Sequence, residues 1–179
     1  MWLKIAKKGT GYVSITYAEA LDVALCWGWI DSVKNACDDA WWLQKFTPRG
    51  PRSIWSKINR AKALALAASG AMKPPGHTEI ERAKKDGRWE AAYEGAKNAT
   101  VPDDFAAALA KSPSAAKFFA ALDGASRYAI LFRIHNVKRT ETRARKIAAF
   151  VQMLARGEKS GVWARGSRRK SRSARSLPR

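Results

Sequence analysis

A segment rich in proline and arginine carries the residue types best suited to bind an anion. It runs from Thr47 to Asn59 with the sequence TPRGPRSIWSKIN. Its two prolines stiffen a loop that leads into a predicted helix start, and arginine side chains and free helix N–H groups both favour phosphate or carboxylate. The anion-binding candidates in this segment are Arg49, Arg52, Ser53, Trp55, Lys57 and Asn59. The alternative is a solvated basic loop in which Trp55 anchors the helix in the core.

A second basic cluster lies on a predicted helix near the other end of the chain. Its anion-binding candidates are Lys138, Arg139, Arg143 and Lys146. Spacings of four and three place Arg139, Arg143 and Lys146 on one helix face. Such a face could follow a nucleic-acid backbone or cap the acidic ends of neighbouring helices. The alternative is a solvated helix face, which is the usual role of a run of charges.

Tryptophan is concentrated at the start of the chain, where six of the eight lie within the first 55 residues. Aromatic rings beside arginines can form a stacking platform for nucleic-acid bases. The same rings can fill the core of a small sheet, and we expect this role for most of them. Trp41 and Trp42 are adjacent on a predicted strand and must point to opposite faces, so one of the two is expected to be exposed.

Other patterns give no basis for catalysis, a metal or a cofactor, and we expect none of the three. His77 and His135 are isolated, and the spacing of Cys26 and Cys37 matches no zinc motif. We expect both cysteines to be free, buried or partly buried thiols. The chain contains no glycine-rich phosphate loop, nucleophile elbow or HExxH motif. A conventional enzyme is therefore disfavoured, unless a pocket joins Asp31, Arg49, Arg52 and Asn59.

The net charge of +19 over 179 residues is the main bulk feature, and it is unevenly distributed. Residues 40–78, 125–156 and 157–179 each carry +7, whereas residues 1–39 and 79–124 each carry −1. Segregated positive blocks attract an anionic partner such as nucleic acid or a phosphate ligand. No apolar run approaches the roughly 20 residues of a membrane span, and the first residues do not resemble a signal peptide. We therefore expect a cytoplasmic protein.

The pattern of residues predicts an α+β fold. Strands are expected over 2–5, 29–34 and 41–47, with a helix from Thr16, which forms a capping box with Glu19, to Gly28. A second helix is expected to start at Ser53 or Ser56, with Trp55 and Ile58 facing inward, and a third near Thr78, after a break at Pro74-Pro75-Gly76. Four more helices are expected after this one, and they start at Pro102, Ser112, Ser126 and Thr140. The result is a small antiparallel sheet with a packed helix, followed by a mainly helical part and a disordered basic tail.

We divide the chain into a tryptophan-rich α+β domain over residues 1–94, a linker over 95–101 and a helical domain over 102–157. Residues 158–179 are mostly arginine, serine, glycine and lysine. Such a segment cannot bury enough apolar surface to offset its ordering entropy, so it is expected to be disordered.

An ordered series of motifs resembles the YdeI/OmpD-associated family, also called bacteriocin-protection proteins, over residues 2–157. The motifs that carry the resemblance are WLKIAKKG at 2–9, TYAEA at 16–20, CWGWID at 26–31, FTPR at 46–49, RSIWSKIN at 52–59, GAM at 70–72, VPDD at 101–104, Arg127-Tyr128 and KRTETRARKI at 138–147. The family usually has further residues before the first strand, and the basic tail is not one of its features.

The resemblance implies a helical domain of this family over 102–157 and an uncharacterised, non-enzymatic protein. Its name implies a stress-related role in protection against bacteriocins or cationic antimicrobial peptides, and association with a porin. It implies no catalytic residues. The alternative function is a nucleic-acid or phosphate-binding module that uses the loop 47–59 and the helix 138–146.

Overall fold

The structure is a computed structural model that describes residues 1–159. The chain forms two compact units, Met1–Lys97 and a second that begins at Asn98. The boundary between the units falls inside the segment that the sequence assigns to a linker. The expected disordered tail lies, from residue 160 onward, outside the described residues.

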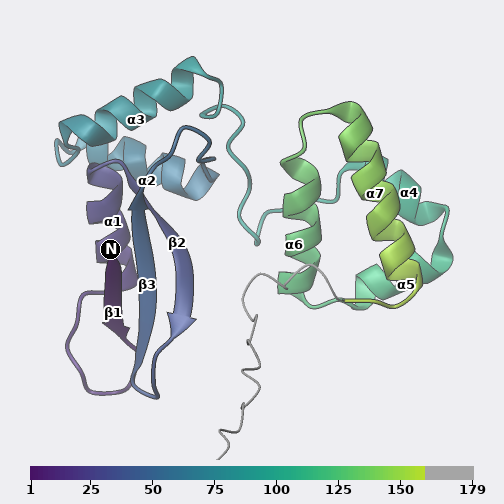
Figure 1. The fold of residues 1–179 in the computed structure, drawn as a ribbon, viewed down its shortest axis with the longest axis horizontal. Helices are drawn as coiled ribbons and strands as arrows, with labels where there is room; N and C mark the ends of the chain where they lie inside the picture. Colours follow the sequence, from purple (N-terminus) through teal and green to yellow (C-terminus); the bar gives the residue numbers. More distant parts are fainter. Residues whose placement is uncertain (160–179) are drawn as a thin grey trace, which may run out of the picture. The chain divides into compact units, whose positions relative to one another are not determined.

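The N-terminal unit contains a three-stranded antiparallel sheet and three helices (Figure 1). Its elements are β1 (Trp2–Ala6), α1 (Tyr17–Cys26), β2 (Trp29–Ala36), β3 (Trp41–Pro48), α2 (Lys57–Ala68) and α3 (Pro74–Lys85). The strand order is β1-β3-β2, so the third strand in the chain is central. The predicted α+β class and the antiparallel sheet are confirmed.

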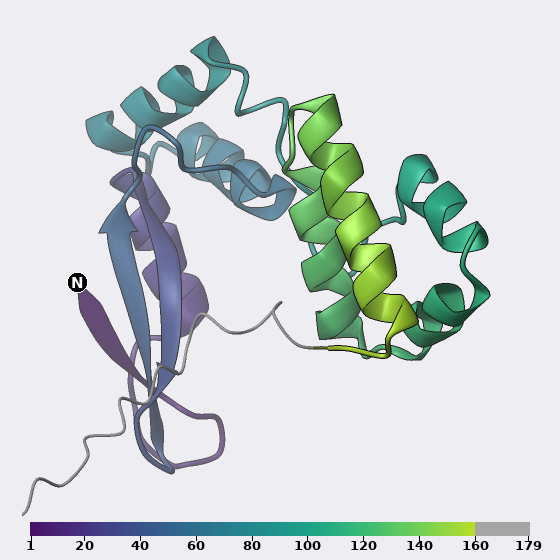
Figure 2. The same ribbon diagram turned by 45° about the vertical axis from the view of Figure 1, so that its right-hand side comes forward.

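Helix α1 begins with the predicted capping box. The Thr16 hydroxyl accepts a hydrogen bond from the Glu19 backbone N–H, and the Glu19 carboxylate accepts one from the Thr16 N–H. The helix ends before Gly28, which has a positive φ of 72°. Leu21 and Leu25 are buried in a core that also contains Phe46 of β3, so α1 covers one face of the sheet. Figure 2 shows α1 running alongside the strands.

The expectation that most of the early tryptophans form the core is wrong. Of the six in residues 1–55, only Trp55 is buried, at 2% exposure. Trp2 and Trp27 are 44% and 51% exposed, and Trp29, Trp41 and Trp42 have intermediate exposure. For Trp2 and Trp41 the physical reason is the architecture, because a helix on only one side of a three-stranded sheet leaves the other face without a covering layer.

Three local expectations for α2 and α3 are also corrected or refined. Ser56, not Ser53, caps α2 by accepting a hydrogen bond from the Asn59 N–H. Ile58 is 58% exposed and does not face the core. Helix α3 starts at Pro74 instead of near Thr78, because prolines fit the first turn of a helix, where their missing N–H would have no partner.

The C-terminal unit is entirely helical in its described part. Its elements are α4 (Asp103–Ala110), α5 (Pro113–Ala121), α6 (Gly124–His135) and α7 (Thr140–Ala155). Their inward faces share one hydrophobic core, in which the most buried side chains are Phe105, Ala115, Ile130, Ile134 and Leu154. Asp123 caps α6 instead of Ser126, and Arg139, not Thr140, occupies the cap position of α7.

Candidate functional site

The arginine loop directs one of its two arginines into the interior. Arg52 is exposed, whereas Arg49 is only 4% exposed and lies against Trp55, with 3.5 Å between its guanidinium carbon and the ring centroid. Arg49 also donates a hydrogen bond from Nη1 to the Ile54 carbonyl oxygen. The loop therefore presents one arginine instead of two, and Trp55 anchors the start of α2 in the core.

Two further arginines hold this loop from outside it. Arg82 of α3 donates to the carbonyl oxygen of Arg49, and Arg88 donates to that of Ser53. Burial lowers the pKa of Arg49 to about 10, and the negative charges of Glu79 and Asp31 act against this shift. Arg49 remains cationic at neutral pH. Its Nε and Nη2 atoms find no hydrogen-bond partner among the described residues.

The remaining candidates of the loop are largely engaged by the protein itself. The Ser53 hydroxyl accepts a hydrogen bond from the Gly50 N–H. Lys57 forms an ion pair with Glu94, and its backbone N–H donates to the Tyr93 carbonyl oxygen. Asn59 is buried, with its N–H bound to the Ser56 cap. The N-terminal turn of α2 thus has protein partners for two of its N–H groups.

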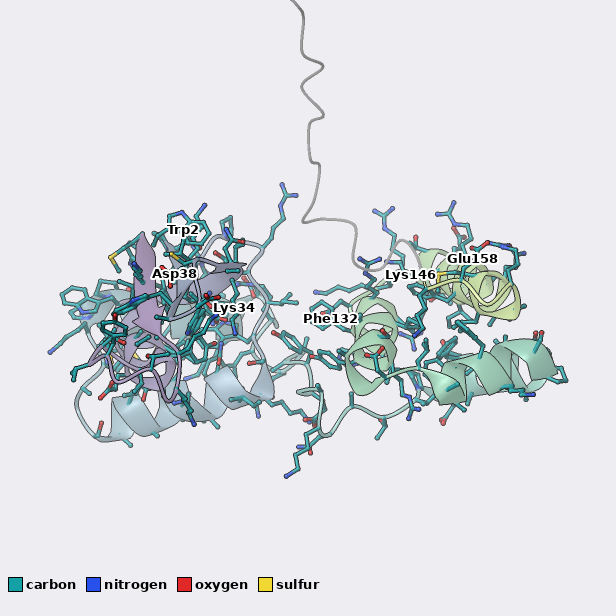
Figure 3. All side chains as sticks on the ribbon, turned by 90° about the horizontal axis from the view of Figure 1, so that it is seen from below. Trp2, Lys34, Asp38, Phe132, Lys146 and Glu158 are labelled. Atoms are coloured by element: carbon teal, nitrogen blue, oxygen red, sulfur yellow. The ribbon has the colours of Figure 1, made fainter. Side chains whose placement is uncertain are left out.

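In the C-terminal unit, the residues of the predicted basic face have different environments, since one is held in an ion pair and others are exposed. Arg143 forms a two-pronged ion pair with Asp104 of α4, with contacts of 2.6 and 2.9 Å, and also donates to the Ile134 carbonyl oxygen. These contacts join α7 to α4 and to the end of α6, so Arg143 has a structural role. Lys138 and Arg139 are exposed, and Lys146, which is labelled in Figure 3, is half-buried.

The sequence analysis missed a group of lysines that lie over tryptophan rings on the sheet. Strand pairing places Trp2 opposite Lys45, and Ala6 opposite Trp41. Opposite residues in an antiparallel pair share a face, and alternate residues along a strand do so too. The face away from α1, which we call the open face, therefore includes Trp2, Lys4, Trp41, Leu43 and Lys45.

Two lysine–tryptophan pairs are formed on the open face. The Nζ atom of Lys45 lies 5.7 Å from the Trp2 ring centroid, and that of Lys4 lies 5.0 Å from the Trp41 ring. Asp38 lies 3.6 Å from the Lys4 Nζ atom and offsets part of its charge. The alternation of lysine and tryptophan in WLK at 2–4 and WWLQK at 41–45 was the available signal in the sequence.

A third pair lies on the opposite face of the sheet. The Lys34 Nζ atom is 4.3 Å from the ring centroid of Trp42. Strict alternation from Asp31 would send Lys34 to the open face, but a β-bulge between these residues shifts the register of β2 by one. Because a bulge re-aims the side chains that follow it, Lys34 shares the face of Asp31 and Trp42. Sequence alternation alone could not have shown this.

Other polar residues near the sheet have structural partners. The Asp38 carboxylate accepts hydrogen bonds from the Ala40 and Trp41 N–H groups, which is common turn chemistry. Of the two cysteines, Cys26 is buried and Cys37 is exposed, so the expectation of a buried or partly buried thiol is wrong for Cys37. Within residues 1–159, no group of three or more histidine, cysteine or acidic residues is arranged to hold a metal ion.

None of the helices in the described part of the chain is long and apolar enough to cross a membrane.

Comparisons with known proteins divide the chain in the same way as its fold. Residues 1–79 match a family described as a domain of unknown function (DUF8412). Residues 98–157 match the family described as Bacteriocin-protection, YdeI or OmpD-Associated. No curated protein and no solved structure matches the chain. The C-terminal unit, over residues 98–157, thus belongs to the bacteriocin-protection, YdeI or OmpD-associated family.

Proposed function

We propose that this protein is a non-enzymatic, single-stranded nucleic-acid-binding protein, and that the open face of its sheet is the binding surface. The observation that carries the proposal is the pairing of Lys45 with Trp2 and of Lys4 with Trp41 on a face that α1 does not cover. Proteins that bind single strands without strong sequence preference combine basic groups for the backbone with aromatic rings for the bases.

The contact energies favour the replacement of a lysine ammonium over a tryptophan ring by a nucleic-acid base. An exposed contact between a cation and an aromatic ring contributes about 0.5–1 kcal/mol. A nucleic-acid base stacked on an aromatic side chain contributes about 1–3 kcal/mol. A base can therefore take the place of the Lys45 ammonium over Trp2, whereas the Trp41 ring also packs against Tyr12, at a centroid distance of 5.2 Å. The displaced ammonium stays close enough to contact the adjacent phosphate.

The charge of the chain supports the same partner. Residues 1–97 and residues 98–159 each carry a net charge of +6. Within the N-terminal unit, exposed Arg52 adds to the attraction for a polyanion, and exposed Lys138 and Arg139 do so within the C-terminal unit. Arg49, Trp55 and Arg143 are engaged in interior or ion-pair contacts, and in this proposal they support the fold instead of contacting nucleic acid.

The test is a titration of fluorescently labelled single-stranded DNA against a variant that ends at Lys159. This truncation is needed because residues 160–179 carry seven basic and no acidic residues, which bind any polyanion weakly. We expect binding that survives the truncation and weakens steeply with salt. Trp2→Ala and Lys45→Gln should each weaken it several-fold, corresponding to about 1 kcal/mol.

Lys34→Gln is the matched control, because it removes the same charge from a lysine that also lies over a tryptophan, but on the other face. Equal losses for Lys34→Gln and Lys45→Gln would show a general charge effect and contradict a specific open-face site. Loss of all binding on truncation would contradict the proposal entirely.

A protective role against bacteriocins or cationic antimicrobial peptides is a second candidate, supported by the family match of residues 98–157. Direct capture of cationic peptides by charge is disfavoured, since both units are themselves positive. The test is survival of bacteria that express the protein during exposure to a cationic peptide, with an empty vector as control. Unchanged survival would contradict this role.

A further inference from the structure

A cleft lies on the α1 side of the sheet, between the strands and the loop that joins β1 to α1. It encloses about 660 Å³, within the usual range of roughly 300–1,000 Å³ for small-molecule sites. Its chemically distinctive lining is Lys7, Lys8, Tyr12, Tyr17, Lys34 and Trp42. The cleft therefore combines three cationic side chains with three aromatic rings.

The charge inside the cleft is positive. None of the described residues that line it is acidic. The Asp31 carboxylate accepts a hydrogen bond of 2.9 Å from the Tyr17 hydroxyl and thereby fixes the position of that ring, and the Glu19 carboxylate is held by the Thr16 hydroxyl and N–H. Burial and the Asp31 carboxylate raise the pKa of Tyr17 above its usual value, so the phenol stays protonated and neutral. Lys7 is oriented by donating to the Asp38 carbonyl oxygen.

The aromatic side of the cleft is assembled from separate elements. Trp42 of β3 and Tyr17 of α1 have ring centroids 6.0 Å apart, with their planes tilted by 44°. Lys34 of β2 reaches the Trp42 ring only because of the bulge in its strand. On the loop side, Gly9 and Gly11 adopt positive φ, and an added Cβ at either would meet no atom within 4 Å.

We infer that this cleft binds a mononucleotide, a ligand with a planar base and a phosphate group. The base would stack on Trp42 beside Tyr17, and the phosphate would be held by Lys34 with Lys7 and Lys8. The ammonium of Lys34 must leave the Trp42 ring for this, which costs about 0.5–1 kcal/mol, less than a stacked base returns. The proposed stacking ring Trp42 and phosphate ligand Lys34 lie on the other side of the sheet from Trp2 and Lys45, although Tyr12 of the cleft also contacts the Trp41 ring at a centroid distance of 5.2 Å.

The experiment is a titration of the full chain with ATP, adenosine and pyrophosphate, monitored by calorimetry and by the indole N–H signals in NMR spectra. Trp42→Phe identifies the Trp42 signal by its disappearance. We expect ATP to bind more tightly than either adenosine or pyrophosphate and to shift the Trp42 signal. Lys34→Gln should weaken ATP binding about tenfold. Lys85→Gln, the same charge change at an exposed position at the end of α3, should leave it unchanged.

Two results would overturn the inference. One is an unshifted Trp42 signal at saturating ATP, and the other is an equal effect of Lys34→Gln and Lys85→Gln. Because Lys34 is exposed, its substitution should leave the fold intact, which circular dichroism verifies. The 5′ end of a nucleic-acid strand also carries a base next to a phosphate group. A 5′-phosphorylated oligonucleotide therefore tests whether the cleft binds the end of a strand. If ATP binds and oligonucleotides do not, the proposed function fails while the mononucleotide site stands.

Discussion

The guanidinium carbon of Arg49 lies 3.5 Å from the ring centroid of Trp55, and both side chains are almost completely buried. This pair joins the end of β3 to the start of α2. Trp55 in turn packs edge-on against Trp89, which follows α3, at a centroid distance of 4.8 Å. A cation that the sequence places in a surface loop is therefore part of the packing that closes the N-terminal unit.

We expect Arg49→Lys to lower the free energy of unfolding of the N-terminal unit by about 2 kcal/mol, because lysine lacks the planar group that stacks on Trp55. Tryptophan fluorescence during urea denaturation measures this unit, since seven of the eight tryptophans lie in residues 1–97. Arg52→Lys in the same loop is the control and should change stability by less than about 0.5 kcal/mol. Equal effects of the two substitutions would contradict a structural role for the stacked arginine.

The capping box of α1 allows a second stability prediction. Thr16→Ala removes the hydroxyl that accepts from the Glu19 N–H, leaving one helix N–H without its partner. The expected loss is about 1 kcal/mol in the free energy of unfolding, measured by the same urea titration. Thr78→Ala removes the same atoms from an exposed position within α3 and should cause no loss. A smaller effect at Thr16 than at Thr78 would show that the box does not stabilise α1.

Local chemistry made part of the fold predictable from the sequence. The Thr16–Glu19 box and the alternation around Trp41 involve only residues close in sequence, so α1 and the three strands could be expected from these patterns. The end of α1 was likewise marked by Gly28. These local signals do not depend on how the helices and strands pack against one another.

Burial in the N-terminal unit could not be predicted in this way, because it depends on which sheet face a helix covers. Trp2 is exposed for this reason, while Arg49, a residue type seldom buried, lies inside. The bulge between Asp31 and Lys34 also has no clear local signal, yet it decides which face Lys34 occupies. The candidate sites on the sheet therefore became visible only with the strand register.

The junction between α1 and α3 depends on the absence of a side chain at Gly76. A Cβ atom there would lie 2.2 Å from the Met72 sulfur and 2.3 Å from the Cys26 carbonyl oxygen. Since the second contact is with backbone, the helices would have to separate. We expect Gly76→Ala to destabilise the N-terminal unit by roughly 2–4 kcal/mol in the urea titration.

Gly124→Ala is the matched control for this substitution. A Cβ at Gly124 meets no atom within 4 Å, and the residue lies in the first turn of α6. Because alanine restricts the unfolded chain more than glycine does, the expected change is zero or a gain of up to about 1 kcal/mol. Thermal unfolding followed by circular dichroism compares the two variants. A stable Gly76→Ala variant would show that α3 can shift away from α1 without cost.

The ion pair between Asp104 and Arg143 predicts a pH-dependent contribution to the C-terminal unit. Hydrogen bonds from Arg143 lower the pKa of Asp104 below its usual value of about 3.9. A carboxylate with a depressed pKa in the folded state adds stability above its unfolded pKa, and that contribution disappears as the pH falls through the folded value. We therefore expect Asp104→Asn to destabilise the unit at neutral pH, and the difference from wild type to vanish in strong acid.

Hydrogen exchange of the α7 backbone, read by mass spectrometry, measures this effect within the C-terminal unit itself. Asp103→Asn is the control, because it removes an equal charge from the same helix turn without touching Arg143. Both substitutions weaken the interaction with the helix dipole. Only the additional exchange in Asp104→Asn, compared with Asp103→Asn, therefore reports the ion pair. Because the pair is partly exposed, high salt should reduce this difference in exchange between the two variants. Equal exchange in the two variants at neutral pH would mean that the contact between α4 and α7 is held by the apolar core alone.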